Sequence, residues 1–338
     1  RIAYRIVYDA LATSRPLGGF SQLRLCCFSA QRGHANLALT LDCIQYFGLT
    51  AGHPQNTIAP QPIVTQPTWL TPASYTKGEP FMLEKAAIFA REWLPICALS
   101  QLENKGDYVS AAIGGWPIFA VRDDASVRVF RNTCAHQNMM IVEKPAGQCS
   151  VLQCRYHGWQ YALDGKFIGA PPLVAPADPA APSNNLVPLA SATMQGLMFG
   201  NLRDDAPAFK TEARLGEEDG NASRGRFMLA RTTDVACNWK AYVEQRLADG
   251  WRFEWPLLVV HANGAIAEQI VPRSFLRTRI VSLVAGSADN SGEAERAIED
   301  AAPRVEMLQQ RYESGDIARL DWPAAHAFRA RVAAAIRA

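Results

Sequence analysis

The chain has 338 residues, of which 49% are apolar and 20% are charged, and its formal net charge is +2. This length is sufficient for two domains with cores of their own, and the composition is typical of a globular protein. The near balance of charge gives no indication of nucleic acid or an anionic membrane as a partner, and apolar runs such as 255–260 are too short to span a bilayer.

Residues 1–76 contain no lysine and no glutamate, which sets them apart from the rest of the chain. We therefore expect an N-terminal extension over 1–68, outside the fold. Apolar residues near helical spacing then predict a helix over 79–94. Short runs rich in β-branched residues, separated by glycine and aspartate turn signals, predict a small antiparallel β sandwich or barrel between 105 and 202.

The second half of the chain alternates between helical and strand-like patterns. Residues 203–226 are polar and charged, which indicates a linker. Residues 236–248 place Trp239, Val243 and Leu247 on one helix face. The elements predicted after that helix are strands over 253–260, 265–271 and 278–285 and helices over 293–313 and 323–337.

Eight cysteines are spread along the chain. In a chain of this length they do not indicate a disulfide framework, and no secretory signal pattern stands at the N-terminus. Cysteines that ligate metal do so as thiolates, which suits a reducing compartment. We therefore expect a cytoplasmic protein.

Two short segments each combine a thiol with an imidazole, Cys134-Ala-His136 and Cys154-Arg-Tyr-His157. A Rieske-type [2Fe–2S] cluster needs this set, because two histidines replace two cysteines on one of its irons. We predict that Cys134, His136, Cys154 and His157 bind such a cluster and that Trp159 shields it. A tetrahedral zinc ion also accepts two cysteines and two histidines, so a zinc site stays open on the residues alone.

The surrounding sequence resembles a known family. The run NTCAHQNMMIVEKPAGQCSVLQCRYHGWQYALDGKF is similar to the Rieske domain of the ring-hydroxylating oxygenase large subunits. The run LTPASYTKGEPFMLEKAAIFAREW resembles the segment that precedes that domain, including in the choline monooxygenase branch. The family usually has Arg-Gly where Gln137 and Asn138 stand, a departure that removes no ligand. Neither loop has the extra cysteine of respiratory Rieske proteins, which resembles the lower-potential oxygenase type.

The resemblance covers roughly residues 69–338 and implies an α+β fold. An antiparallel β Rieske domain would be followed by an incomplete helix-grip domain, in which an antiparallel sheet packs on helices. The implied parts are an N-terminal extension (1–68), a lead-in helix with the Rieske domain (69–202), a linker (203–226) and a truncated catalytic-type domain (227–338).

Members of this family also carry a mononuclear iron held by two histidines and one carboxylate. The run CNWKAYVEQRLADGW resembles the start of their catalytic segment. The resemblance places the acidic residue that bridges the two metal sites at Asp249, and it places the two iron histidines at Arg252 and Leu257. Neither can replace an imidazole. Asp300 is the position that resembles the family's carboxylate ligand.

Only His261 and His326 lie outside both the cluster motif and the N-terminal extension, and they are not a helical pair. The stretch between the Asn-Trp-Lys helix and Asp300 is also shorter than in the family. This shortening predicts an internal deletion near Gly250 and Trp251. We therefore predict that the mononuclear iron site is lost.

The sequence thus predicts a Rieske [2Fe–2S] electron-transfer protein that resembles the large subunit of aromatic ring-hydroxylating oxygenases, with its own oxygen-activating site incomplete. Whether the chain is itself an enzyme stays open. One alternative is a working oxygenase for an aromatic or small organic substrate, with unusual iron ligands such as His261, His326 and Asp300. Another is a non-catalytic zinc or regulatory protein.

The same interpretation predicts the partners and cofactors. We expect a flavin- or ferredoxin-type reductase as the electron donor, and a homo- or hetero-oligomer with intact oxygenase subunits. The expected cofactor is the [2Fe–2S] cluster, and a mononuclear Fe(II) stays an open question, with Asp300 as its candidate ligand. The sequence identifies no substrate.

Overall fold

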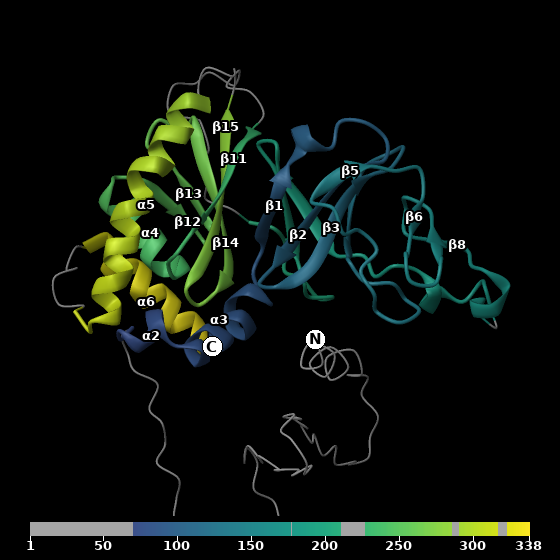
Figure 1. Ribbon diagram of the computed structural model, residues 1–338, viewed down its shortest axis with the longest axis horizontal. Coiled ribbons are helices and arrows are strands. Elements are labelled where there is room, and N and C mark those ends of the chain that lie inside the picture. Colours follow the sequence, from purple (N-terminus) through teal and green to yellow (C-terminus); the bar gives the residue numbers. More distant parts are fainter. Residues whose placement is uncertain (1–69, 177, 211–226, 286–290, 317–322) are drawn as a thin grey trace, which may run out of the picture. The chain divides into compact units, whose positions relative to one another are not determined.

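The computed structural model describes five stretches of the chain: residues 70–176, 178–210, 227–285, 291–316 and 323–338 (Figure 1). The N-terminal extension predicted over 1–68 and most of the predicted linker lie outside the described residues. Residues Thr65–Ala338 cluster as one unit, which contains all five of these stretches. Within them, no helix has the length and apolar character needed to cross a membrane.

Short strands occupy the first half of the described chain, and long helices appear only in the second half. The helical elements are α2 (Ala73–Thr76), α3 (Gly78–Glu84), the π-helical turn η1 (Lys85–Phe89), the 3-10 turns η2 (Leu99–Gln101), η3 (Pro172–Val174) and η4 (Pro182–Asn184), α4 (Trp239–Ala248), α5 (Ser291–Glu313) and α6 (Pro323–Arg337). The strands are β1 (Leu94–Ala98), β2 (Asp107–Ile113), β3 (Trp116–Arg122), β4 (Val127–Arg131), β5 (Ala146–Gln148), β6 (Leu152–Gln153), β7 (Gln160–Tyr161), β8 (Phe167–Gly169), β9 (Ala190–Met194), β10 (Leu197–Asn201), β11 (Phe227–Val235), β12 (Arg252–Glu254), β13 (Leu258–Val260), β14 (Ile266–Ser274) and β15 (Arg277–Ala285).

Two of the predicted elements differ from the observed ones. The helix predicted over 79–94 ends earlier, with η1 at Phe89, and strand β1 starts at Leu94, where the following Pro95 favours extended backbone. The strand predicted over 253–260 is divided into β12 and β13 by a turn that contains Pro256. The helices α4, α5 and α6 confirm the three helices predicted for the second half.

The first half contains two small antiparallel sheets, ordered β4-β3-β2-β5 and β6-β7-β8, and a third antiparallel sheet, ordered β1-β10-β9. The hairpin from β2 to β3 turns at Gly114 and Gly115, with φ of +53° and +92°. A side chain at Gly114 would meet Phe89, since its Cβ would lie 2.5 Å from the Phe89 Cβ. The two sheets share one apolar core, in which Phe119 and Phe130 pack beside the buried Cys134.

The second half is a five-stranded antiparallel sheet, ordered β11-β15-β14-β13-β12, and α4, α5 and α6 lie on one of its faces (Figure 1). Side chains alternate along β14. Ile266 and Ile270 pack into the core that contains the helices, and Ala267 packs with residues of β1 and β10 on the other face. This period of two is expected for a strand buried on both faces. The predicted α+β class is confirmed.

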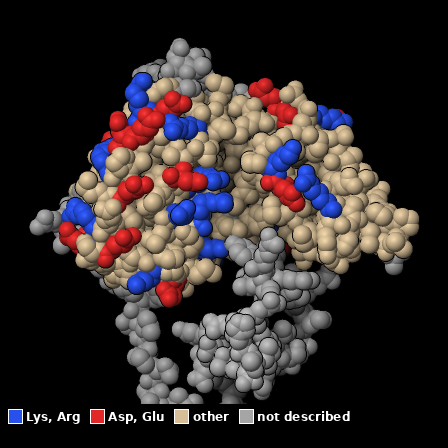
Figure 2. All heavy atoms as spheres, viewed as in Figure 1, with Lys and Arg blue, Asp and Glu red and all other residues tan. Residues whose placement is uncertain are grey.

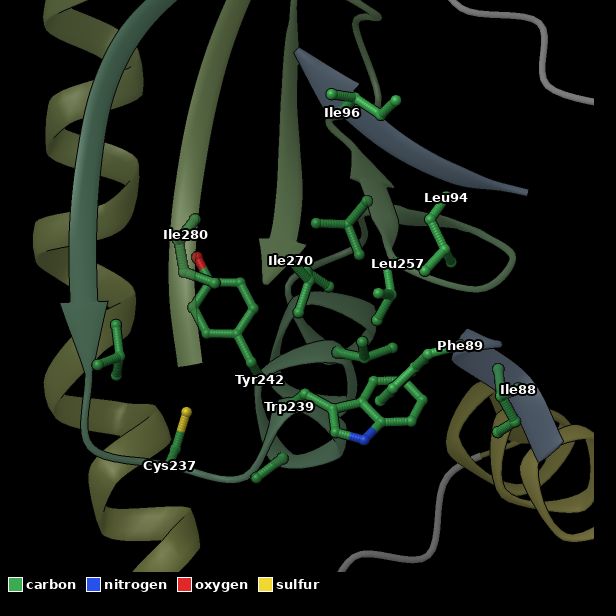
Figure 3. Packing of buried hydrophobic residues seen from close by; sticks show 14 of the residues in the cluster. Ile88, Phe89, Leu94, Ile96, Cys237, Trp239, Tyr242, Leu257, Ile270 and Ile280 are labelled. Carbon is green, nitrogen blue, oxygen red and sulfur yellow. The ribbon is translucent and has the colours of Figure 1, made fainter. Parts of the chain in front are cut away.

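Helix α4 lies at the centre of the larger core. Figure 3 shows Trp239 and Tyr242 of α4 pointing between the sheet and the lead-in segment, which consists of α2, α3 and η1. There Trp239 meets Phe89 edge-to-face, with ring centroids 5.6 Å apart. Ile270 and Ile280 of the sheet line the other side of this space. The lead-in segment therefore packs on the second half of the chain, although it precedes the first half in sequence.

Three charged residues of α4 are almost completely buried, and each forms an ion pair with a different neighbouring element. Lys240 Nζ lies 2.6 Å from Glu84 Oε1 of α3, and the other Glu84 oxygen accepts a hydrogen bond from the Trp239 indole. Arg246 Nε donates to Glu268 Oε2 of β14 at 2.8 Å. Ion pairing of this kind is what makes a buried charge tolerable.

The third buried pair joins α4 to the C-terminal helix. The Glu244 carboxylate accepts two hydrogen bonds from Arg329 of α6, at 2.9 and 2.8 Å. Tyr75 of α2 and Tyr312 of α5 also donate to Glu244, and their rings stack with centroids 3.9 Å apart. Burial raises the pKa of Tyr75, so its phenol stays a donor at neutral pH. Through Glu244, the lead-in segment, α5 and α6 are held on one side chain.

We expect the substitution Lys240→Met to lower the free energy of unfolding by about 3–5 kcal/mol, because it leaves the buried Glu84 carboxylate without its cation. Adding Glu84→Gln should restore part of the loss, since the neutral amide needs no counter-ion. The matched control is Asp234→Ala, which removes the exposed pair with Arg279 and should cost less than about 1 kcal/mol. Urea unfolding followed by circular dichroism measures all three, and equal losses for Lys240→Met and Asp234→Ala would contradict this role of α4.

Candidate metal centre

The first candidate ligand loop comes after β4 and is closed by its own backbone. The Cys134 amide donates to the Met139 carbonyl (2.8 Å), and the Asn138 amide donates to the Cys134 carbonyl (2.9 Å). The buried Asn132 anchors the loop, because its side-chain oxygen accepts from the Val142 amide and its side-chain nitrogen donates to the Val142 carbonyl. Main-chain bonds and one buried amide therefore fix the backbone at Cys134.

Asn138 adopts a left-handed backbone conformation, with φ of +56°. Asparagine is one of the few residues besides glycine that take this conformation at low cost. The oxygenases that the chain resembles usually have glycine at this position. The backbone at Asn138 explains how the departure from Arg-Gly leaves the loop closed.

The second candidate ligand loop connects β6 to β7 and repeats the same pattern. The Cys154 amide donates to the Trp159 carbonyl (2.8 Å), and the Gly158 amide donates to the Cys154 carbonyl (2.9 Å). Gly158 also has a positive φ, +71°. Each loop thus begins with a cysteine, is closed four and five residues later, and carries its histidine between those points.

The structure brings the four predicted ligands together as two pairs. Cys134 and Cys154 are buried, and the Cys154 thiol lies close enough to help raise the pKa of Cys134. His136 and His157 are half-buried, with their Nδ1 atoms 3.2 Å apart. A [2Fe–2S] cluster of the Rieske type takes two thiolates on one iron and two imidazoles on the other. The donor set and its pairing fit that cluster.

Burial raises the pKa of the Cys134 thiol, so the thiolate that ligates iron depends on the positive charge of the metal. A neighbouring phenol supplies further stabilisation. The Tyr161 hydroxyl of β7 lies 3.0 Å from Cys134 Sγ and accepts a hydrogen bond from the Ala135 amide at 3.1 Å. With Cys134 as a thiolate, Tyr161 is the donor to sulfur. The cluster motif does not identify Tyr161. In the sequence it stands out only as an aromatic residue shortly after Trp159.

Each candidate imidazole has an aromatic ring against it. Trp159 is 4% exposed and stacks on His136, with centroids 4.9 Å apart and an interplanar angle of 3°. Its indole N–H donates to the Val174 carbonyl at 2.8 Å, which attaches the loop over 170–176 to the site. Tyr156, which no sequence pattern singled out, lies against His157 at 3.9 Å between ring centroids and is 60% exposed. The buried Trp159 ring therefore covers one face of the His136 imidazole.

Residues 92–187 match the family described as the Rieske [2Fe-2S] domain. The chain therefore contains a Rieske domain. This domain implies a [2Fe–2S] cluster as the cofactor, rather than the zinc ion that the residues alone left open.

Curated relatives place the Rieske domain in a larger context. The alpha subunit of chlorobenzene dioxygenase from Cupriavidus sp. (strain PS12) is 31% identical over 211 residues, which are 58% of this chain and 45% of that protein. The oxygenase subunit of carnitine monooxygenase from Escherichia coli (strain K12) is 29% identical over 189 residues, or 54% of this chain and 50% of that protein. The chain spans about half the length of these relatives.

The fold agrees with that of solved Rieske oxygenases. The apo form of the quaternary ammonium Rieske monooxygenase CntA superposes with a TM-score of 0.65 at 21% identity, over 79% of this chain and 95% of that chain. A naphthalene 1,2-dioxygenase with bound indole gives a TM-score of 0.55 at 15% identity, over 73% of this chain and 80% of that chain. The predicted resemblance to oxygenase large subunits is confirmed, and both halves of the described chain belong to the architecture they share.

The structure places the predicted residues of the second metal site in the helical half of the molecule. Asp249 ends α4, where Arg304 of α5 binds its two oxygens at 2.6 and 2.9 Å and Arg246 lies 3.7 Å away. Asp300 is exposed on α5. Arg252 lies in the edge strand β12, and Leu257 is 3% exposed in the core. Over the described residues, no three or more His, Cys, Asp or Glu side chains are arranged to hold a single metal ion.

The two remaining described histidines lie in different elements. His261 comes directly after β13, and its ring meets Trp251 edge-on with centroids 5.1 Å apart. His326 is on α6 and is exposed. The structure does not bring them together with Asp300 as one group of ligands among the residues it describes.

Substituting Tyr161 by phenylalanine should lower the reduction potential of the cluster, on the order of tens of millivolts. The hydrogen bond from Tyr161 to Cys134 Sγ withdraws electron density from the sulfur and so favours the reduced cluster, which carries one more negative charge. Tyr156→Phe is the matched control, because that side chain is exposed and packs on an imidazole rather than on a sulfur; it should leave the potential unchanged. Redox titration followed by EPR measures the shift, and an unchanged potential in Tyr161→Phe would show that the phenol does not tune the cluster.

Proposed function

We propose that this chain is a one-electron transfer protein whose Rieske cluster is held by Cys134 and Cys154 on one iron and by His136 and His157 on the other. The observation that carries the proposal is the meeting of the two thiols and of the two imidazoles in separate pairs, on two loops closed in the same way. The cluster, once bound, accepts and releases one electron. The chain's residues hold it, tune it and control access to it.

Access to the cluster is one-sided. Cys134 and Cys154 are at most 2% exposed, whereas His136 and His157 are half-buried and line a surface pocket. An electron partner therefore reaches the histidine-bound iron by the shorter route. By similarity to the dioxygenase and monooxygenase subunits, the partner is a flavin- or ferredoxin-type reductase, and intact oxygenase subunits in a mixed oligomer would receive the electron.

The same proposal holds that the mononuclear iron site has been lost. Arg252 and Leu257 stand where the resemblance places histidines, and neither side chain has a lone pair to give to a metal. Asp249 is engaged by Arg304, an ion pair that satisfies its carboxylate within the chain. Asp300 is exposed rather than grouped with other ligands. Hydroxylation by this chain alone is therefore not expected.

A second candidate function is that of a working oxygenase with unusual iron ligands, drawn from His261, His326 and Asp300. The observation that favours it is the extent of the fold, which covers 95% of the CntA chain. The two candidates differ in the amount of iron that each chain retains.

The ligand assignment is tested by Cys134→Ser, which should abolish the rhombic EPR signal of the reduced cluster and its visible absorption. Cys149→Ser is the matched control, since Cys149 belongs to the same domain, is half-buried and is not among the proposed ligands. The control should keep both signals. A Cys134→Ser protein with an unaltered Rieske spectrum would show that the ligand assignment is wrong.

Iron content separates the two candidate functions. We expect about two irons and two sulfides per chain in the purified protein, all of them in the cluster. The double substitution Asp300→Asn with His326→Ala should leave this content unchanged. A third iron that disappears in the double variant would favour the working oxygenase instead.

A further inference from the structure

Strand β12 lies at one edge of the five-stranded sheet, and within the described part of the chain its one strand partner is β13. All three residues of β12 are half-buried. An edge strand with accessible backbone groups is a template for pairing with another chain, and proteins usually block or cover such an edge. The residues of β12 therefore decide what can pair with it.

The backbone of Phe253, at the centre of β12, points outward from the sheet. Phe253 stands opposite Val259 of β13. The His261 amide donates to the Ile266 carbonyl, and backbone groups alternate in direction along an antiparallel strand, so Val259 also directs its backbone groups toward β14. Phe253 is then at a position that is not hydrogen-bonded to β13, and its N–H and C=O point toward the open edge.

The sequence around Phe253 is self-complementary. Arg252 and Glu254 flank it, and Trp251 and Trp255 stand outside them. Two such strands, paired antiparallel about a twofold axis at Phe253, set Arg252 of each copy opposite Glu254 of the other. The same axis sets Trp255 of each copy opposite Trp251 of the other. Opposite charges and aromatic rings are among the cross-strand pairs that stabilise antiparallel strands.

The alternation of side chains along β12 agrees with this symmetry. Arg252 and Glu254 are two residues apart and share one face of the strand. Phe253 and Trp255 share the other face, where Phe253 meets Phe328 of α6 with ring centroids 5.0 Å apart. A twofold axis perpendicular to the sheet keeps each set on its own face. Charged side chains therefore meet charged ones, and rings meet rings.

The surroundings of β12 favour association. The half-buried Trp255 is held in place by the Arg331 guanidinium, 4.7 Å from its ring centroid, and a side chain fixed in advance loses little rotamer freedom on binding. Figure 2 shows acidic and basic side chains interspersed on the visible face of the helical half. The net charge of the chain is only +2. No field of one sign therefore opposes the approach of a second copy.

We propose that a second copy of this chain docks on β12, antiparallel about a twofold axis at Phe253, so that two five-stranded sheets become one continuous sheet. The Phe253 N–H of each copy donates to the Phe253 carbonyl of the other, and two ion pairs between Arg252 and Glu254 flank these bonds. The Trp251 amide is already bound to the Arg246 carbonyl at 2.9 Å, which confines the new ladder to β12. So short a ladder gives a weak dimer, with a dissociation constant on the order of micromolar.

The charge pairing is tested with two reversed variants, Arg252→Glu and Glu254→Arg, studied by sedimentation equilibrium. Each variant alone places like charges opposite each other at two points, which should raise the dissociation constant roughly tenfold. An equimolar mixture should recover the wild-type affinity, because the acidic side chains of one variant then face the basic side chains of the other. Asp234→Arg, on the opposite edge strand β11, is the matched control and should dimerise as the wild type does.

Three results of the sedimentation experiment contradict the proposal. The first is a wild-type chain that stays monomeric throughout the micromolar range. The second is a dimer whose affinity neither variant changes. The third is a loss of the dimer in both variants without recovery in the mixture, which would show that Arg252 and Glu254 do not face each other across the interface.

Hydrogen exchange of the wild-type protein tests the same interface without a variant that must fold. Exchange in the peptide that contains β12 should slow as the protein concentration is raised through the dissociation constant, because the dimer engages the Phe253 amide. Exchange in the peptide that contains β11 should not depend on concentration. Protection of β12 that is equal at every concentration would mean that the edge is covered within each chain. Protection that requires an added oxygenase subunit would mean that the occupant is a different protein. Either result would overturn the second copy as the occupant.

Discussion

The pairing of buried charges on α4 is the constraint on which the packing of the described chain depends. Lys240, Glu244 and Arg246 would each be costly in an apolar core, and each has a partner from a different element. These partners come from α3, α6 and β14, which are far apart in sequence. An ion pair tolerates little displacement at low dielectric, so the three pairs specify where these elements lie. These three buried ion pairs fix the arrangement of the elements around α4 more than they raise the net free energy of unfolding.

The candidate metal centre is held together by main-chain hydrogen bonds rather than by ion pairs. Its two loops are closed by backbone hydrogen bonds, and its cysteines lie in an apolar core shared by the two small sheets. The histidines alone reach the surface. Such a division keeps water from the sulfur ligands and leaves an edge where a redox partner can approach.

The sequence predicted those parts of the molecule whose signals are local. Cys134, His136, Cys154 and His157 were named as candidate ligands because metal ligation restricts both residue type and spacing. The helices α5 and α6 were predicted because a packed helix repeats its apolar face. Other features depend on distant residues. Nothing near Glu244 in sequence indicates Arg329 or Tyr75, and nothing near Cys134 indicates Tyr161. The turn at Pro256 and the end of the first helix before Pro95 were visible in the sequence but were outweighed by apolar periodicity.

The matching closure of the two loops has a consequence for how such a centre changes over time. Because backbone amides and carbonyls close each loop, the side chains between the ligands are not needed to close it. The exceptions are residues 138 and 158, which must adopt a left-handed backbone. Gln137 is one of the side chains that closure does not need, since it replaces a basic residue of the family without disturbing a ligand. Binding of the metal and the chemistry of the surface beside the imidazoles therefore depend on different residues of the same two loops.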